Sequence, residues 1–177
     1  MGERKRIKVL VPVAALVAVT VTGLVVYISI SRAGTGVETR AFEVSLVIGG
    51  EGVEPGKLRH PSGIAVDRLK RTYVVDTLNH RVQVFDAQGN PLMVLGEGEP
   101  QNGSLYLPED VAISPAGSIY VADTGNNRIQ FYAPDGKYMG RIPAQQAPQT
   151  SFSSPGGIAF DGEGNLYVVD TGNNRIL

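Results

Sequence analysis

Four polar residues recur together three times in this 177-residue chain, in the order Asp-Thr-x-Asn-x-Arg. A carboxylate, a hydroxyl, an amide and a guanidinium in one place could bind a polar or anionic ligand. We call these residues the repeat motif: Asp76, Thr77, Asn79, Arg81, Asp123, Thr124, Asn126, Arg128, Asp170, Thr171, Asn173 and Arg175. Because catalytic sites are usually unique, we expect the motif to hold a hairpin through Asx-type bonds to the turn backbone and an Asp–Arg pair.

Metal and cofactor chemistry have few candidate residues. The chain has no Cys, and its only histidines, His60 and His80, lack the third ligand that a catalytic zinc site needs. Residues 161–165 alternate oxygen-bearing side chains as calcium loops do, but the equivalent segments 67–71 and 114–118 do not, so a plain hairpin turn is expected. We predict no catalytic, cofactor-binding or metal-binding residues.

Charge argues against a nucleic-acid partner. The chain has 16 Lys and Arg against 17 Asp and Glu, and acidic side chains outnumber basic ones from Arg40 onward. Neutralising phosphates needs concentrated positive charge. Arg68, Lys70 and Arg71 make a small basic turn, which is typical of a solvated loop. We therefore expect no nucleic acid as a partner.

The elements that carry the motif repeat every 47 residues, as Pro61, Pro108 and Pro155 show. Inside the first unit, short apolar stretches with a period of two predict four strands, at 63–67, 73–75, 81–85 and 91–95. Gly-containing segments between them predict tight turns with positive φ. The pattern predicts an all-β fold of four-stranded antiparallel meanders, with the second strand buried between neighbouring units.

These units resemble the NHL repeat. The resemblance lies in Pro-x-Gly-Ile-Ala-hydrophobic-Asp, followed by hydrophobic-Tyr-Val-x-Asp-Thr-x-Asn-x-Arg. It implies β-propeller blades, commonly six in a ring, with repeat cores at 61–95, 108–142 and 155–177, the last one truncated. We expect residues 43–177 to form this partial propeller, and residues 43–49 to supply the outer strand of a preceding unit.

About three repeats fall short of the roughly four to eight blades of a closed propeller. An open arc leaves blade faces unpaired and a hydrophobic last strand without a polar cap. We therefore expect the chain to be a piece of a longer protein. Self-association of two arcs into one ring is the alternative, if the chain is complete.

An uncharged stretch of 22 residues from Val9 to Ile30 precedes the repeats. As a helix it would reach roughly 33 Å, enough to cross a hydrocarbon core of about 30 Å. We predict one transmembrane signal-anchor helix at 9–31, inserted in the lipid bilayer, with a linker at 32–42. Basic residues are concentrated in 1–8, so this N-terminus is predicted to be cytoplasmic and the propeller extracytoplasmic, in a single-pass protein of the cell membrane.

A cleaved signal peptide is the alternative to an anchor. Its apolar core is usually only about 7 to 15 residues long, shorter than this stretch. Ser31-Arg32-Ala33 offers a small-x-small cleavage site. In that case the remainder is secreted, and both alternatives export the repeats.

The function we expect is recognition of a protein, peptide or envelope ligand by a scaffold or sensor module. Specificity is expected in the long connectors at 49–60, 97–107 and 143–154, on one face with the repeat motif. The alternative is a fragment of a propeller enzyme, a metal-dependent lyase or lactonase-like hydrolase, with its site in missing blades. The lyase domain of peptide-amidating enzymes is similar in fold and uses zinc-bound histidines, but no histidine cluster permits that transfer.

Overall fold

The computed structural model of the chain describes residues 25–26, 46–98, 103–142 and 151–177. The predicted cytoplasmic segment 1–8 and the linker 32–42 lie outside these residues, as does most of the predicted membrane helix. Among the described residues, no helix is long and apolar enough to cross a membrane.

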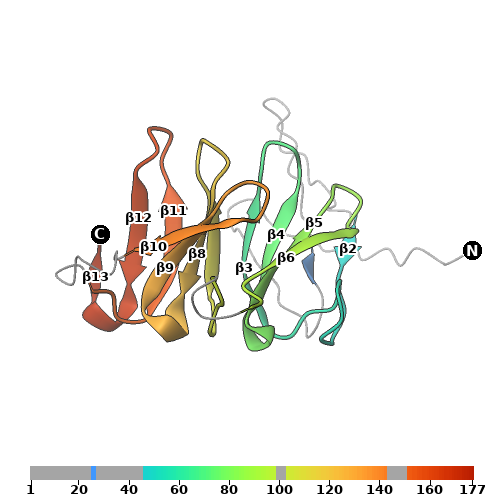
Figure 1. The fold of residues 1–177 in the computed structure, drawn as a ribbon, viewed down its shortest axis with the longest axis horizontal. Coiled ribbons are helices and arrows are strands. Elements are labelled where there is room, and N and C mark those ends of the chain that lie inside the picture. The colour runs from blue at the N-terminus through green and yellow to red at the C-terminus, as the bar shows by residue number, and fades with distance from the viewer. Residues whose placement is uncertain (1–24, 27–45, 99–102, 143–150) are drawn as a thin grey trace, which may run out of the picture.

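Two complete four-stranded antiparallel meanders and one of three strands make up the fold (Figure 1). The first blade consists of β3 (Pro61–Val66), β4 (Thr72–Asp76), β5 (Arg81–Phe85) and β6 (Pro91–Leu95). The second consists of β7 (Asp110–Ile113), β8 (Ile119–Asp123), β9 (Arg128–Tyr132) and β10 (Tyr138–Ile142). The third consists of β11 (Pro155–Phe160), β12 (Leu166–Asp170) and β13 (Arg175–Ile176). The predicted all-β meanders are confirmed.

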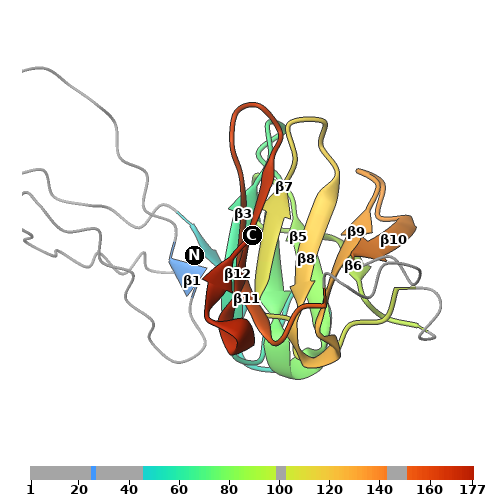
Figure 2. The same cartoon turned by 90° about the vertical axis from the view of Figure 1, so that its left-hand side faces the viewer.

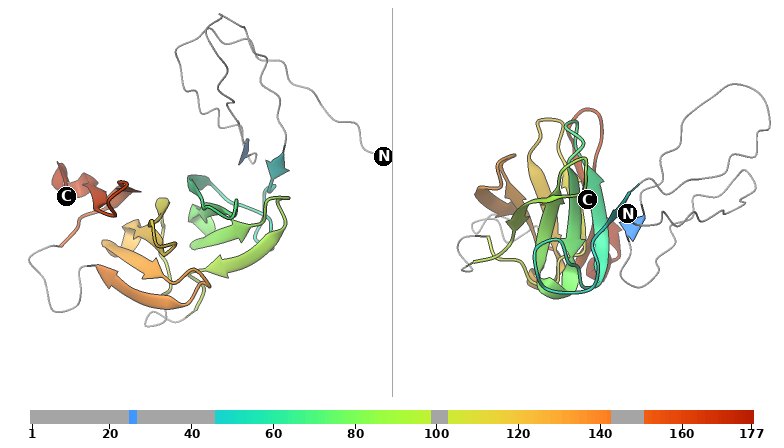
Figure 3. Two further views of the ribbon diagram at one scale, coloured as in Figure 1. Left: turned by 90° about the horizontal axis from the view of Figure 1, so that it is seen from above. Right: turned by 90° about the vertical axis from the view of Figure 1, so that its right-hand side faces the viewer.

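The blades stand next to one another as an arc, seen from above in the left panel of Figure 3. Their first strands, β3, β7 and β11, contact one another in chain order along the inner side of the arc. The fourth strands β6 and β10 lie on its outer side (Figure 3). In the side view of Figure 2 the same sheets are seen one behind another. This is the arrangement of blades in a β-propeller.

Apolar side chains between the blades form the core. One cluster joins the first blade to the second, and another joins the second to the third. The prediction of a buried second strand holds for β4, where all five residues are buried. In β12 only Val168 and Asp170 are buried, because no described element covers the other face of this strand.

Tight turns join the strands, and three of the predicted glycines take the left-handed conformation. Gly89, Gly136 and Gly164 have φ values of 83°, 88° and 92°. In the first blade the position equivalent to Gly164 is held by Lys70, with φ 61°. A side chain with a Cβ is strained in this region, so this turn keeps the shared geometry at a cost.

The N-terminal region differs from expectation at two residues. Val25–Val26, inside the predicted helix at 9–31, form the strand β1, which pairs antiparallel with β2 (Val47–Ile48). In this structure these two residues are extended rather than helical, and their β-branched type suits a strand paired with β2. The position of β2 fits the expected outer strand at 43–49.

Candidate functional site

The repeat motif occupies the turn between the second and third strands of each blade. In the first blade Asp76 ends β4, a single 3-10 turn η1 (Thr77–Asn79) follows, and Arg81 begins β5. His80 closes this turn in the left-handed region at φ 58°. The turns η3 (Thr124–Asn126) and η5 (Thr171–Asn173) repeat the geometry.

An Asp–Arg ion pair closes each of these hairpins. Arg Nε donates to Asp Oδ2 across 2.8 Å in the first blade, 2.6 Å in the second and 2.7 Å in the third. The pairs are Arg81–Asp76, Arg128–Asp123 and Arg175–Asp170. All three carboxylates are fully buried, whereas the Arg side chain is 6% exposed in the first blade and 42% exposed in the third. The pair is thus best shielded where connector and neighbouring blade both cover it.

The second oxygen of each carboxylate binds a connector. Asp76 Oδ1 accepts from the backbone N–H of Arg59 at 2.6 Å, and Asp170 Oδ1 accepts from that of Ser153 at 2.7 Å. The expected Asx-type bond from Asp to its own turn is not formed at η1, η3 or η5, the turns of this type that the structure describes. The reason is geometric, since each carboxylate points back to the connector 17 residues earlier.

The other polar groups of the motif extend this attachment. Arg81 Nη2 donates to the carbonyl oxygens of Glu54 and Lys57, both at 3.2 Å. Asn79 Nδ2 donates to the Asp76 carboxylate and to the carbonyl of Gly52. Each motif therefore holds the connector leading into its own blade, which places connectors and motifs on one face of the arc.

Sequence reasoning missed two members of this network. Gln83 and Gln130 are fully buried in the third strands, and their Nε2 atoms donate to the motif carboxylate and to a connector carbonyl. Their 47-residue spacing was the available signal. The third unit has Leu177 at the equivalent position, so the glutamine is not common to all three units.

The threonines of the motif point toward the following blade. Thr124 Oγ1 donates to the carbonyl of Pro155, at the start of the third blade, at 2.7 Å. In the first blade the Thr77 hydroxyl lies 2.7 Å from that of Ser62, which donates to the Glu109 carbonyl of the second blade. The motif thus joins neighbouring blades as well as holding connectors.

Electrostatics follow from these contacts. Burial by itself would raise the pKa of Asp170, but the N–H of Ser153 and the side chains of Asn173 and Arg175 lower it overall. Asp110 differs, because burial raises the pKa of this carboxyl more than the backbone N–H groups of Ile158 and Val111 lower it. The motif carboxylate of the third blade is therefore held ionised.

The other residues considered for metal binding lie apart from one another. His80 accepts a hydrogen bond at Nδ1 from the N–H of Leu107, and its ring stacks on Tyr106 at 5.0 Å. Asp161 accepts bonds from Glu163 and Asn165 of its own turn. In the described part of the chain, no group of three or more His, Cys, Asp or Glu residues is arranged to hold a metal ion.

The basic turn is tied to the protein by Arg71. Its Nε atom donates to Asp67 at 2.6 Å, and its Nη1 atom donates to the Pro134 carbonyl of the next blade at 3.2 Å. Arg68 and Lys70 are exposed beside it.

Fold and motif together define an arc of β-propeller blades, and sequence comparison identifies the repeat. A family model described as NHL repeat matches residues 58–85, 105–132 and 152–177. The chain therefore carries three NHL repeats, as predicted. Protein brain tumor of Drosophila melanogaster is 44% identical over 46 residues, which are 26% of this chain and 4% of that protein.

Solved structures share the fold at low sequence identity. A catalytically inactive virginiamycin B lyase from Staphylococcus aureus with quinupristin matches with a TM-score of 0.52 and 16% identity, over 77% of this chain and 40% of that one. A gluconolactonase from Xanthomonas campestris matches with a TM-score of 0.51 and 21% identity, over 66% and 42%. This chain spans less than half of either structure, and the likeness concerns the fold alone.

Proposed function

We propose that this protein is a membrane-anchored, extracytoplasmic NHL-repeat propeller that binds protein, peptide or envelope ligands as a scaffold or sensor module. The observation that supports this most is the attachment of the connectors. Buried Asp side chains and their Arg partners, joined by a buried Gln in the first two blades, hold connector backbones whose own sequences differ. Variable loops on a rigid frame are a common design for binding.

Two exposed apolar side chains lie on this face of the arc. Val53 in the first connector is 56% exposed, and Tyr106 in the second is 51% exposed. The backbone beside each is fixed, since Gly52 bonds to Asn79 and the N–H of Tyr106 bonds to Asp123. Apolar and aromatic groups on a fixed backbone lose little conformational entropy on binding, which suits a protein or peptide ligand.

Site-specific photo-crosslinking tests the proposal. A photoreactive phenylalanine analogue is placed at Val53 or Tyr106 in the full chain in its native membrane, and at Leu92 and Met139 as controls. Both controls are exposed apolar residues on the outer strands β6 and β10. Protein or peptide adducts at the connector positions alone are expected. Equal adducts at all four positions, or none at the connectors, would contradict binding at this face.

The membrane anchor is proposed from the uncharged stretch and the basic residues before it. A helix over 9–31 requires Val25–Val26 to leave the pair with β2, which contains only two residues of each strand. Burying about 20 apolar residues in lipid releases far more free energy than breaking the two residue pairs between β1 and β2 costs.

Cysteine labelling tests the topology, because the chain has no Cys of its own. Gly2→Cys and Leu69→Cys are each labelled in intact cells with a membrane-impermeant maleimide. Labelling at position 69 alone is expected, with position 2 reacting only after permeabilisation. Labelling at both positions would disprove the orientation. Loss of the position 2 label from the mature protein, together with its release from membranes, would indicate the cleaved signal peptide instead.

The alternative is an enzyme fragment of the lyase or lactonase type. Its support is the fold likeness to a virginiamycin B lyase and a gluconolactonase. Fold by itself does not imply function, whereas the attached connectors are a feature of this chain. Binding is therefore the function that we favour.

A further inference from the structure

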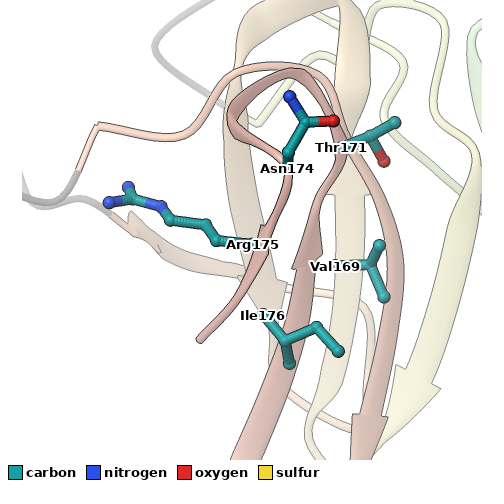
Figure 4. Close-up of a pocket in the computed structure, with 5 residues that line it drawn as sticks. All are labelled: Val169, Thr171, Asn174, Arg175 and Ile176. Atoms are coloured by element: carbon teal, nitrogen blue, oxygen red, sulfur yellow. The ribbon is translucent and has the colours of Figure 1, made fainter.

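A hydrogen bond crosses each described boundary between blades, from the connector of one blade to the motif turn of the blade before it. Asn127 Oδ1 accepts from the backbone N–H of Ser154 at 2.7 Å, and His80 Nδ1 accepts from that of Leu107 at 3.1 Å. Both acceptors close their turns in the left-handed region, at equivalent positions of the repeat. Asn174 holds the same position in η5, where it lines a pocket (Figure 4). We call the His80–Leu107 and Asn127–Ser154 contacts the inter-blade bonds.

The residue that donates each inter-blade bond has a strained backbone. Leu107 has φ 45° and Ser154 has φ 47°, although both carry a Cβ. The left-handed region is costly for such residues, and the bond at the N–H of the same residue helps to hold it there. Each of them precedes a proline, Pro108 or Pro155, and a residue in that place otherwise prefers an extended backbone. The inter-blade bond therefore selects the conformation of the end of the connector.

The two acceptors differ in their response to pH. An amide oxygen accepts at every pH, whereas a ring nitrogen of histidine accepts only while it carries no proton. Because Nδ1 accepts from Leu107, the imidazole of His80 is neutral in this bond and its proton lies on Nε2. A proton added at Nδ1 would direct a second donor at the N–H of Leu107. The His80–Leu107 bond therefore requires a neutral imidazole, and the Asn127–Ser154 bond has no such requirement.

The charged groups near His80 come from four segments. These are its own hairpin, the end of the first connector, the second connector with the start of β7, and the second motif turn. Their charged and titratable side chains are Arg59, His60, Asp76, Arg81, Glu97, Tyr106, Glu109, Asp110, Asp123 and Arg128. Three of the carboxylates are paired with arginines. Imidazole is the side chain that ordinarily changes its charge between about pH 5 and 8, so His60 needs a control, and so does Asp110, because burial raises its pKa.

The stack between His80 and Tyr106 tolerates both charge states. The two ring centroids are 5.0 Å apart and the planes are inclined by 29°. A protonated imidazole is attracted to an aromatic face, so protonation does not expel the ring. The N–H of Tyr106 is also bonded to the carboxylate of Asp123, and this bond involves no imidazole. Protonation therefore acts on the N–H of Leu107 and leaves the neighbouring attachment of the connector in place.

We propose that His80 is a proton-operated switch at the boundary between the first and second blades. Above roughly pH 6.5, where free imidazole is neutral, His80 holds Leu107 in the left-handed conformation. At lower pH the protonated ring releases Leu107 toward the extended region, while the apolar cluster between the two blades stays packed. The exposed ring of Tyr106, the preceding residue, then changes its direction on the connector face. The consequence for ligand binding rests on the proposed function, whereas the switch itself does not.

Hydrogen exchange of single backbone N–H groups tests the switch. It is measured by NMR on the full chain in detergent, and rates are corrected for the intrinsic effect of pH on exchange. Between about pH 7.5 and about pH 5.5 the protection of the Leu107 N–H should fall roughly 2- to 10-fold, the effect of losing one hydrogen bond. The protection of the Ser154 N–H should stay constant. A fall at both positions, or at neither, would overturn the proposal.

The repeat itself supplies matched variants. His80→Asn introduces the acceptor of the second blade, so Leu107 should keep its protection at both pH values. Asn127→His moves the imidazole to the next boundary, and the protection of Ser154 should then fall at the lower pH. A pH-dependent Leu107 in His80→Asn, or a constant Ser154 in a folded Asn127→His protein, would refute the role of the imidazole.

Two control variants separate His80 from the other groups that titrate nearby. His60→Asn removes the only other histidine, and Asp110→Asn removes the carboxyl whose pKa is raised by burial. Both variants should keep the fall in protection at Leu107. Loss of the fall in either variant would assign the pH dependence to that group and overturn the role of His80.

The link to binding has a separate test, because the exchange measurements need no ligand. With the photoreactive analogue at Val53, the yield of adducts should fall from about pH 7.5 to about pH 5.5 in the otherwise wild-type chain and stay constant with His80→Asn. Adducts with the same yield at both pH values would refute the regulation of binding and leave the switch standing. Absence of adducts at both pH values would contradict the proposed function instead.

Discussion

The Oδ1 atom of Asp123 accepts a 2.7 Å hydrogen bond from the backbone N–H of Tyr106, 17 residues earlier. The other oxygen of the same carboxylate accepts from Arg128 and Gln130. One buried side chain therefore joins the end of a strand, the start of the next strand and the connector that enters the blade. The bonds from the carboxylate to the connector and to the Arg recur in all three blades and link the fold to the proposed binding face.

Replacing Asp123 by Ala should destabilise the protein strongly. The change leaves Arg128 and Gln130 buried without their acceptor, and breaking a buried pair in this way costs about 3–5 kcal/mol. Urea unfolding of the full chain in detergent measures the difference in the free energy of unfolding. Asp135→Ala is the control, because among the described residues Asp135 bonds only to its own exposed turn, and its loss should cost less than about 1 kcal/mol. Similar costs for both variants would contradict the assigned role.

Gln83 and Gln130 form a matched pair with one difference. Gln83 Oε1 accepts from the N–H of Gly56 at 2.8 Å, whereas Gln130 Oε1 is buried and has no hydrogen-bond partner among the described residues. Gln83→Met leaves the N–H of Gly56 without its acceptor, whereas Gln130→Met removes an oxygen that has no partner. Gln83→Met should therefore cost about 1–3 kcal/mol more, measured by urea unfolding. Equal costs would show that the Gly56 bond contributes nothing.

Lys70→Gly should stabilise the first blade. Lys70 has φ 61° at the position where the other units have Gly117 and Gly164, and a left-handed residue with a Cβ costs about 1–2 kcal/mol. Glycine also loses about 0.5–1 kcal/mol through chain entropy, so the net gain is at most about 1.5 kcal/mol. Thermal unfolding measures the change. Arg68→Gly, in the same turn but without a positive φ, should instead lower the melting temperature, and a gain from both variants would refute the explanation.

The ion pair of the same turn predicts a pH dependence. Burial tends to raise the pKa of Asp67, but hydrogen bonds and charge from Arg71 lower it below its usual 3.8. A lowered pKa in the folded state contributes stability that is present above about 3.9 and is lost as the pH falls through the folded value. The stability gap between wild type and Asp67→Asn should therefore be wide at pH 7 and narrow in strong acid.

Denaturant unfolding at several pH values between 7 and 2 measures this gap. Arg71→Gln removes the guanidinium but keeps the backbone N–H of residue 71 and the Tyr73 hydroxyl, which also lower the pKa of Asp67, so this variant should lose part of the pH dependence. A gap that stays constant down to pH 2 would show that Asp67 is not held ionised by Arg71.

Much of the fold could be predicted from local pattern. The period of 47 residues and the alternation of apolar residues predict the strands, and β5 and β6 begin and end where the pattern places them. Glycine predicts the turn at Gly89, because only a residue without a Cβ takes that φ without strain. Each of these features depends on a few neighbouring residues.

Contacts between distant residues could not be predicted in this way. The Asx-type bond expected at Asp76 is replaced by a bond to Arg59, because the connector folds back over the end of the hairpin. Gln83 was overlooked because a glutamine in a strand carries no sign of burial until the connector covers it. The strand at Val25–Val26 likewise depends on a distant edge rather than on local preference.

The amino-acid sequence by itself determined the repeat, the strands, the turns and the pairing of Asp with Arg in each unit, because these arise between residues close in the chain. Only the tertiary structure decided which faces are covered. Val75 and Val169 have the same residue type in equivalent strands, yet one is fully buried and the other 45% exposed. The difference is the presence of a following blade, and burial by a neighbouring blade is a property of the assembled arc.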